Sequence, residues 1–385
     1  MKTYLVGGAL RDRLLGLPVS DRDWLVVGAT PEEMVQRGYL PVGRDFPVFL
    51  HPKTREEYAL ARTERKSAPG YRGFTIHAAP DVTLEQDLAR RDLTINSIAL
   101  PAELAGEPAG DGGQFSLRAE ALVDPFHGQR DLQARVLRHV TDAFREDPVR
   151  ILRVARFAAR FHQFGVAPET MALMREMAGA GEVDALVPER VWQELARGLM
   201  EAMPSRMFAV LQDCGALARL LPELAPAADR MTALDRAAQA GAPLPVRFAC
   251  LMRGLGPALP ALCERWRVPI EERDLALLVD REGHRIDAST ELDAAQVMDL
   301  LERSDAIRKP QRFEQALLAC ECGAPGARAS DYAPRPRLAA ALAAARAVAT
   351  DSIARDAQLA GAAGPKIGEA IRAARVAAVR SIPPA

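Results

Sequence analysis

The sequence lacks several patterns that would decide its class at once. No apolar run is long enough to cross a bilayer, although 49% of the 385 residues are hydrophobic. A strand-like segment begins directly after Met1, so the basic start and continuous apolar stretch of a secretory signal are missing. We therefore expect a soluble, cytoplasmic protein without membrane contacts, long enough for two or three domains.

Paired cysteines are also missing. The five cysteines form no C-x-x-C pair, and an odd number without framework spacing suits reduced thiols in a cytosolic protein. Cys320 and Cys322 could hold a soft metal. Small side chains on a helix are the more common explanation of such a pair, and we favour it.

A large excess of one charge is absent as well. The formal net charge is −1, which neither favours nor excludes a polyanionic partner, because the local distribution of charge matters more than the sum. Between Arg130 and Arg160, however, eight arginines stand against four acidic residues. We expect a phosphate backbone or a triphosphate to bind there.

The first hundred residues mix strand and helix patterns. Residues 3–6, 23–27 and 57–62 have the patterns of strands, and a short helix follows Gly7-Gly8. From about residue 138 the pattern is helical and rich in Ala and Leu. The sequence therefore predicts an α+β fold, with a mixed head followed by an all-helical neck, body and tail.

Two carboxylates stand at the start of the second strand. Asp21 and Asp23 are two residues apart, so on a strand they point to the same face and repel each other unless a cation lies between them. Hard oxygen ligands of this kind suit Mg²⁺, which also binds phosphate oxygens. Alone, an Asp-x-Asp pair is usually a solvated strand end, so this prediction depends on its surroundings.

The glycine pair is part of those surroundings. Gly7-Gly8 lets the backbone approach a ligand closely, and Arg11 on the next helical turn can bind phosphate oxygens. By itself the pair is a tight turn, since it fits neither the dinucleotide-binding pattern nor the P-loop. The order of strand, glycine turn, helix and Asp-x-Asp strand resembles the nucleotidyltransferase superfamily that includes DNA polymerase β. In that superfamily Glu57 would be the third carboxylate, and Glu56 would point the other way.

Five motifs follow one another in the first half of the chain. They are Gly7-Gly8-x-x-Arg11-Asp12, Asp21-x-Asp23, Arg62-Thr63-Glu64, the run from Arg90 to Asn96, and Glu146-Asp147-x-x-Arg150. Their order and spacing resemble the bacterial (class II) CCA-adding enzymes, and residues 43–52 resemble the gammaproteobacterial type. The resemblance is strong over about 220 residues and weak beyond. It implies a polymerase-β-like head and template-independent addition of CCA to tRNA from CTP and ATP.

The resemblance also implies a role for each matched residue. Asp21 and Asp23 would bind two Mg²⁺ ions, with Glu57 aiding the ion that activates the primer 3′-hydroxyl. Gly8 and Arg11 would hold the triphosphate. Arg91, Asp92 and Asn96 would contact the sugar and phosphates, although Arg91-Asp92 could instead be a helix ion pair of little energetic consequence.

Asp147 and Arg150 support an inference about base choice. Three residues apart on a helix, they would lie on one face. Cytosine and adenine each present an amino donor beside a ring-nitrogen acceptor, whereas uracil and guanine present a carbonyl beside an N–H. One Asp–Arg pair can satisfy the first two bases and leaves unpaired groups against the others, so it could replace a template. The alternative is an intrahelical salt bridge.

Four arginines continue this helix at spacings of three, three and four: Arg150, Arg153, Arg156 and Arg160. They would form one basic stripe, with Phe157 and Phe161 supplying apolar contacts elsewhere around the helix. A solvated charged face is the usual explanation of such a stripe. Beside a triphosphate site, we interpret Arg153 and Arg156 as nucleotide ligands.

The resemblance fails in the C-terminal half. Gammaproteobacterial relatives continue into an HD phosphohydrolase domain that binds metal through His-Asp pairs. None of the six histidines here is followed by Asp, and Arg253-Gly254 stand where such a pair is expected. Without those ligands a metal-dependent phosphatase or phosphodiesterase site cannot form, so we expect nucleotidyltransferase activity only.

We expect three domains. Residues 1–138 would be the catalytic head, 139–225 a neck that recognises the base, and 226–385 a body and tail with a degenerate HD-like region that binds tRNA. Residues 101–120 have the composition of a loop-like insertion. No obligate protein partner is inferred.

Three rival functions stay open. A partial enzyme that adds only CC or only A, and a bacterial poly(A) polymerase, share the head motifs. The intact region from Arg44 to Arg62 disfavours CC-only addition, and the short, near-neutral C-terminus disfavours poly(A) synthesis. A catalytically silent RNA-binding protein would have no physical need for three clustered carboxylates.

Overall fold

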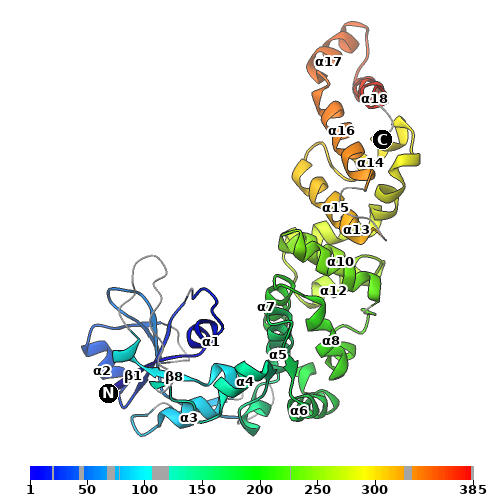
Figure 1. Ribbon diagram of the computed structural model, residues 1–385. Coiled ribbons are helices and arrows are strands. Elements are labelled where there is room, and N and C mark those ends of the chain that lie inside the picture. Colours follow the sequence, from blue (N-terminus) through cyan, green and yellow to red (C-terminus); the bar gives the residue numbers. More distant parts are fainter. Residues whose placement is uncertain are drawn as a thin grey trace. The chain divides into compact units, whose positions relative to one another are not determined.

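The computed structural model describes residues 1–19, 21–42, 47–66, 74–77, 79–105, 121–225, 227–324 and 332–382. The chain forms two compact units (Figure 1): Met1–Val191 with Arg206–Leu221, and Trp192–Ser205 with Pro222–Ala385. Most of the expected insertion at 101–120, and residues 43–46 of the gammaproteobacterial-like segment, lie outside the described residues. Across these ranges, none of the helices combines the length and the apolar character needed to span a membrane.

The first unit opens with a six-stranded sheet in the order β3-β4-β5-β2-β1-β8. Neighbouring strands are antiparallel except β2 and β5, which run parallel. The three predicted strands are confirmed, with the third ending at Leu60 rather than Arg62. The strands are β1 (Lys2–Val6), β2 (Asp23–Val27), β3 (Leu40–Val42), β4 (Val48–Leu50), β5 (Glu57–Leu60) and β8 (Ala99–Pro101).

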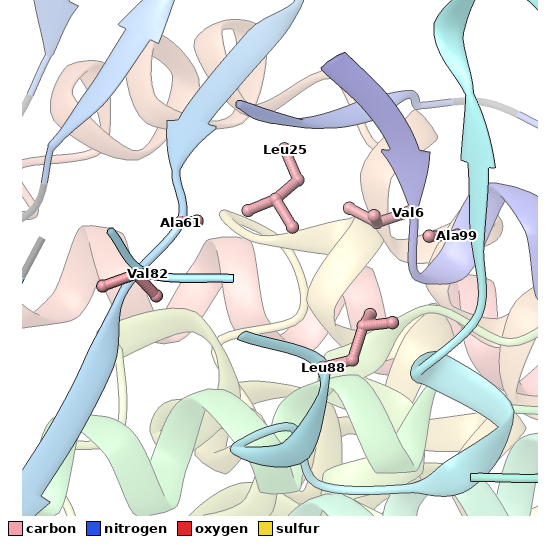
Figure 2. Packing of buried hydrophobic residues seen from close by; sticks show 6 residues of the cluster. All are labelled: Val6, Leu25, Ala61, Val82, Leu88 and Ala99. Atoms are coloured by element: carbon pink, nitrogen blue, oxygen red, sulfur yellow. The ribbon is translucent and has the colours of Figure 1, made fainter. Parts of the chain in front are cut away.

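Side chains alternate between the two faces along each strand, and apolar residues pack against both faces of this sheet. On one face, Val6 of β1 and Leu25 of β2 pack with Leu88 of α3 (Leu84–Ala89), as Figure 2 shows. On the other face, Val26 packs with Met34 of α2 (Pro31–Gln36). Asp23 lies two residues before Leu25, so it belongs to the face that α3 covers.

The predicted change to a helical pattern near residue 138 is confirmed. The pattern did not predict β10, whose two residues pair in parallel with β9 and are too few to show an alternation. The elements from residue 8 to 221 not yet named are α1 (Gly8–Leu14), β6 (Thr63–Lys66), β7 (Phe74–His77), η1 (Thr94–Asn96), η2 (Ala102–Leu104), α4 (Gly128–Ala134), β9 (Val136–Leu137), η4 (Asp142–Glu146), α5 (Val149–Arg160), β10 (Gly165–Val166), α6 (Pro168–Gly179), η5 (Glu182–Ala185), α7 (Pro188–Leu199), α8 (Ser205–Asp213) and α9 (Ala216–Leu220).

The second unit is helical throughout its described part. Its core helix is α11, which is buried from Pro245 to Met252 and packs against α10, α13 and α15. The final helices are far less buried, since α17 has no buried residue and α18 has only Val379. The elements are α10 (Ala228–Gln239), α11 (Leu244–Met252), α12 (Ala258–Arg265), α13 (Ile270–Asp287), η6 (Ala288–Glu291), α14 (Ala294–Arg303), α15 (Pro310–Gly323), α16 (Pro334–Ala347), α17 (Thr350–Leu359) and α18 (Pro365–Arg380).

Candidate active site

The turn after β1 depends on glycine. Gly7 has a φ of +74°, in the left-handed region that other residues adopt only at a cost. A Cβ at Gly7 would lie 3.1 Å from Arg91 Nη1 and 4.0 Å from Asp23 Oδ2. A Cβ at Gly8 would lie 3.4 Å from Arg11 Nη2. The glycine pair therefore gives the room in which two arginines and one carboxylate approach the turn.

Asp23 and Glu57 lie side by side at the start of two neighbouring strands. They are register partners of the parallel pair β2–β5, and partners of this kind point to the same face of a sheet. Glu56 belongs to the opposite face, as predicted, and its Oε2 accepts a hydrogen bond of 3.2 Å from Trp24 Nε1. The sequence pattern thus correctly identified which glutamate accompanies Asp23.

Asp21 corrects one premise of the sequence argument. The strand β2 begins at Asp23, so strand alternation does not extend to Asp21. The two carboxylates nevertheless interact. The pKa of Asp23 is raised above its usual value, mainly because the carboxyl is buried away from water. Arg91 lowers this pKa in part, and the negative charge of Asp21 raises it further. Within the described ranges, no three His, Cys, Asp or Glu side chains are grouped closely enough to hold a metal ion.

Arg91 lies beyond the end of α3 and faces the turn. Its Nη2 donates to Asp87 Oδ2 and its Nη1 to the Asn96 carbonyl, both at 3.3 Å. Its Nε is buried and has no hydrogen-bond partner among the described residues. A buried donor without a partner is costly, and an incoming acceptor would satisfy it. Arg91 forms an ion pair with Asp87, not the Arg91–Asp92 pair that the sequence left open.

Arg11 is turned inward from α1. Its Nε donates to Asp12 Oδ1 at 2.8 Å and its Nη1 to Asn96 Oδ1 at 2.7 Å. The second oxygen of Asp12 accepts from Arg160 Nη2 on α5 at 2.8 Å. Only 4% of Arg11 is exposed, so its orientation is fixed by these contacts.

The chain of contacts continues from Asn96 back to α5. Asn96 Nδ2 donates to Asp92 Oδ1 at 3.0 Å, and Asp92 Oδ2 accepts from Arg153 Nε at 2.7 Å. Burial alone would raise the pKa of Asp92, but Arg153 and the Asn96 hydrogen bond hold it well below its usual value. We call this set of residues, which begins and ends on α5, the α1–α5 polar chain: Arg160, Asp12, Arg11, Asn96, Asp92 and Arg153.

Two of the four arginines of α5 are buried, whereas the side chains of Arg153 and Arg160 are each 33% exposed. Arg150 is 6% exposed and Arg156 is 8% exposed. The rings of Phe157 and Phe161, which we expected elsewhere around the helix, instead lie beneath guanidinium groups. Arg11 is centred 5.1 Å from the Phe157 ring, and Arg156 is 4.7 Å from the same ring. Such cation–π contacts hold the guanidinium groups in place while leaving edges for hydrogen bonds.

Asp147 corrects a second premise. It does not lie on the helix with Arg150, because α5 begins at Val149 and Asp147 has an extended backbone. The cause is Pro148, since a proline disfavours helical conformation in the residue before it. The two residues are still one turn apart: the Arg150 N–H donates to the Asp147 carbonyl at 3.0 Å, and Arg150 Nη1 donates to the Ala143 carbonyl at 2.7 Å.

Three residues that contact the predicted site residues received no role in the sequence analysis: Asp12, Arg160 and Arg190. Asp12 stands inside the first motif and Arg160 continues the arginine spacing of α5, so both could have been proposed as partners. Arg190 forms an ion pair with Asp147 across 43 positions of sequence, and no local pattern indicates it.

In the second unit, the residue at the expected His-Asp position, Arg253, forms an ion pair. Arg253 ends α11, and its guanidinium pairs with Asp287. A Cβ built at Gly283 would lie 3.0 Å from Arg253 Nε, and one built at Gly323 would lie 3.2 Å from its Nη1. The two glycines thus leave the space that this arginine fills.

Known proteins resemble this chain in sequence and in fold. Residues 3–138 match the poly A polymerase head domain family, and residues 163–228 match a family described as a probable RNA and SrmB-binding site of polymerase A. The fold matches a CCA-adding enzyme in complex with ATP (TM-score 0.72, 18% identity, 99% of this chain and 86% of that chain). It also matches the Thermotoga maritima CCA-adding enzyme complexed with tRNA (TM-score 0.66, 19% identity, 99% and 88%).

Closer relatives cover the whole length. The multifunctional CCA protein of Variovorax paradoxus is 64% identical over 100% of both chains. That of Polaromonas naphthalenivorans is 60% identical over 99% of this chain and 98% of the relative. With such identity along the full length, this chain belongs to the multifunctional CCA protein family.

Proposed function

We propose that this chain adds C, C and A to tRNA 3′ ends without a template, using CTP and ATP and releasing pyrophosphate. Family membership supports the reaction. The structural observation that carries it is the register of Asp23 with Glu57 beside the Gly7 turn, where Arg91 also arrives. Carboxylates and arginines converging on one glycine turn suit a metal–triphosphate substrate.

We assign Mg²⁺ to Asp21 and Asp23, and Glu57, the register partner of Asp23, would aid the ion that activates the primer 3′-hydroxyl. The donor chemistry fits, because all three offer hard carboxylate oxygens and the Asp21 charge disfavours ionisation of Asp23, a repulsion that a cation would relieve. When bound there, two ions would lower the pKa of the primer 3′-hydroxyl and neutralise the leaving pyrophosphate.

Gly8, Arg11 and Arg91 are the proposed triphosphate ligands. The unpaired Nε of Arg91 supports this role, and the room at Gly8 lets phosphate oxygens come near Arg11 Nη2. Asp92 and Asn96 hold Arg11 and Arg153 through the α1–α5 polar chain, and we retain them as contacts to the sugar and phosphates.

Asp147 and Arg150 are the proposed base readers, with Arg153 and Arg156 beside them as nucleotide ligands. Base reading does not require a shared helix face, because one carboxylate and one guanidinium close in space suffice for the acceptor–donor pattern. The short backbone contact between Asp147 and Arg150 keeps them close.

The remaining assignments are also proposals. The head would be residues 1–138, the neck 139–225 and the tRNA-binding body and tail 226–385. We also propose that the chain lacks HD phosphohydrolase activity. Arg253 supports this proposal, because its guanidinium pairs with Asp287 at the place in the sequence where a metal-binding His-Asp pair is expected. We further propose that the protein acts in the cytoplasm.

One assay tests the proposal. The purified protein with Mg²⁺ receives tRNA transcripts ending at the discriminator base, at C, or at CC, with each NTP separately. We expect C, C and then A, with no UMP or GMP. Extension of CC-ended tRNA alone, or long A tails, would establish a rival function instead.

Two variants complete the test. Asp23→Ala should abolish every addition, and residual turnover would remove the metal assignment. Glu56→Gln is the matched control, because Glu56 faces away from the site and Gln still accepts from Trp24. It should retain wild-type activity.

A further inference from the structure

Asp147 needs a partner to fix its carboxylate. It lies between η4 and α5 with an extended backbone, so it lacks the helical packing that fixes the orientation of a side chain. Its Oδ1 accepts from the Val149 N–H at 3.2 Å, a local contact that leaves the carboxylate plane undetermined. A base reader, by contrast, must present its oxygen in one direction.

Arg190 provides that partner. Its Nη1 donates to Asp147 Oδ1 at 3.0 Å and its Nη2 donates to Asp147 Oδ2 at 2.7 Å. Two parallel bonds from a planar guanidinium fix both the position and the plane of a carboxylate. Arg190 is itself anchored near the start of α7, where the next residue, Val191, is 3% exposed.

The bonding leaves capacity for a base. A carboxylate offers about four lone-pair sites. Oδ1 uses two of its sites, on Val149 and Arg190, whereas Oδ2 uses one, on Arg190. The second site of Oδ2 can therefore accept the amino group of cytosine or adenine.

We propose that Arg190 is a specificity-determining residue, which aims Asp147 Oδ2 at the amino group shared by C and A. This inference rests on the proposed function and extends it to Arg190, which lies on α7. Arg190 acts through Asp147, so it is a positioning residue for base choice. Lysine cannot replace it, since an ammonium is a point charge that does not fix the carboxylate plane.

The experiment measures selectivity rather than activity alone. Arg190→Lys and Arg190→Gln are assayed for kcat/KM with CTP, ATP, UTP and GTP on the matching tRNA transcripts. We expect the ratio of correct to incorrect incorporation to fall about tenfold to a hundredfold, as for the loss of one charge-assisted hydrogen bond. The KM for inorganic pyrophosphate in the reverse reaction, which reports on the phosphate ligands, should stay near the wild-type value.

Arg197→Gln, on the same helix, is the matched control, because Arg197 is 55% exposed at its side chain and its ion pair with Glu194 is 4.0 Å long. It should leave selectivity unchanged. In an Asp147→Ala background, Arg190→Gln should cause no further loss of selectivity, because Arg190 acts only by orienting the carboxylate that Asp147→Ala has already removed. The thermal midpoint of each variant identifies any that fails to fold, and Arg190→Lys retains the charge if Arg190→Gln does not fold.

The outcomes separate the two claims. A wild-type protein that adds no CCA refutes the proposed function. A wild-type protein that adds CCA, with Asp147→Ala blurring base choice and both Arg190 variants fully selective, refutes only the role of Arg190. Equal loss of selectivity in the control would likewise overturn it.

Discussion

Gly7 sets the distance between the turn after β1 and Arg91. Its backbone has a positive φ, and an added Cβ would stand 3.1 Å from Arg91 Nη1. Any larger residue would therefore meet two separate obstacles, the strained backbone and the crowded guanidinium. Only the second belongs to the proposed active site.

A pair of alanine variants can separate these obstacles. Gly215→Ala should lose about 1–2 kcal/mol of stability because its φ is positive, and Gly7→Ala should lose at least as much, because crowding against Arg91 adds to the same kind of strain. Only Gly7→Ala should also lose nucleotide affinity, since nothing lies within 4 Å of a Cβ at Gly215. Chemical denaturation and the KM for CTP measure the two effects. An unchanged KM in Gly7→Ala would show that Arg91 is not placed by this turn.

Asp92 predicts a pH effect on stability. Its pKa is depressed in the folded chain, so the stabilisation it contributes is present above the unfolded value of about 3.9 and is lost as the pH falls below it toward the folded pKa. Asp92→Asn should cost about 1–3 kcal/mol at pH 7 and should flatten the loss of stability below about pH 4. Urea unfolding at several pH values measures both.

The control for this series is Asp213→Asn. Asp213 is exposed, and Arg175 Nε donates to its backbone carbonyl rather than to its carboxylate. Its acid profile should follow that of the wild type. A profile for Asp92→Asn that is parallel to the wild-type curve would mean that the Arg153 contact contributes no net stability.

At the scale of elements, α5 holds both ends of the α1–α5 polar chain. Arg153 and Arg160 are seven residues apart, close to two helical turns, so they lie on one side of α5. The contacts between them pass through α1 and η1, which ties three elements together. A change at either end should therefore reach Arg11.

Arg160→Gln tests this coupling. It removes one of the two arginine contacts of Asp12, whose side chain is 12% exposed, and keeps the contact with Arg11, so we expect a loss of about 1–2 kcal/mol. We also expect a severalfold rise in the KM for CTP and ATP, because Arg11 loses one support of its orientation. Thermal unfolding and steady-state kinetics provide the measurements. Arg145→Gln, which breaks an exposed pair with Glu176, should change stability by less than about 0.5 kcal/mol.

The elements also show how far the sequence could predict the site. Strand alternation correctly distinguished Glu57 from Glu56, because the register of β2 and β5 depends on a local repeat of two. It failed at Asp21, where the strand has not yet begun, and helical spacing failed at Asp147, where Pro148 delays the helix. Arg190 could not be predicted at all, since its pairing depends on tertiary packing rather than on spacing.

At the scale of the whole molecule, the two compact units differ in the contacts of their charged side chains. In the first unit, the buried Arg11 and the partly buried Arg91 approach the Gly7-Gly8 turn, where we propose that the triphosphate binds. In the second unit, Arg253 pairs with Asp287, and the Tyr332 hydroxyl donates a 2.6 Å hydrogen bond to the same carboxylate. The charges of this cluster satisfy one another.

The protein should therefore not act as a phosphohydrolase. With Mg²⁺, Mn²⁺ or Ni²⁺, hydrolysis of p-nitrophenyl phosphate and bis(p-nitrophenyl) phosphate should stay at the background rate of a heat-inactivated sample. The same preparation should add CCA, which shows that it is active. Metal-stimulated hydrolysis that Asp287→Ala removes would contradict the prediction.

Gly283 and Gly323 make substitution of Arg253 depend on substitutions at other positions. A side chain added at Gly283 alone would crowd the guanidinium, with its Cβ 3.0 Å from Arg253 Nε, whereas a smaller residue at position 253 alone would leave a void and remove the cation that pairs with Asp287. Neither step is neutral without the other. Substitutions at position 253 should therefore occur together with substitutions at the two glycine positions, and relatives that keep the arginine should keep both glycines.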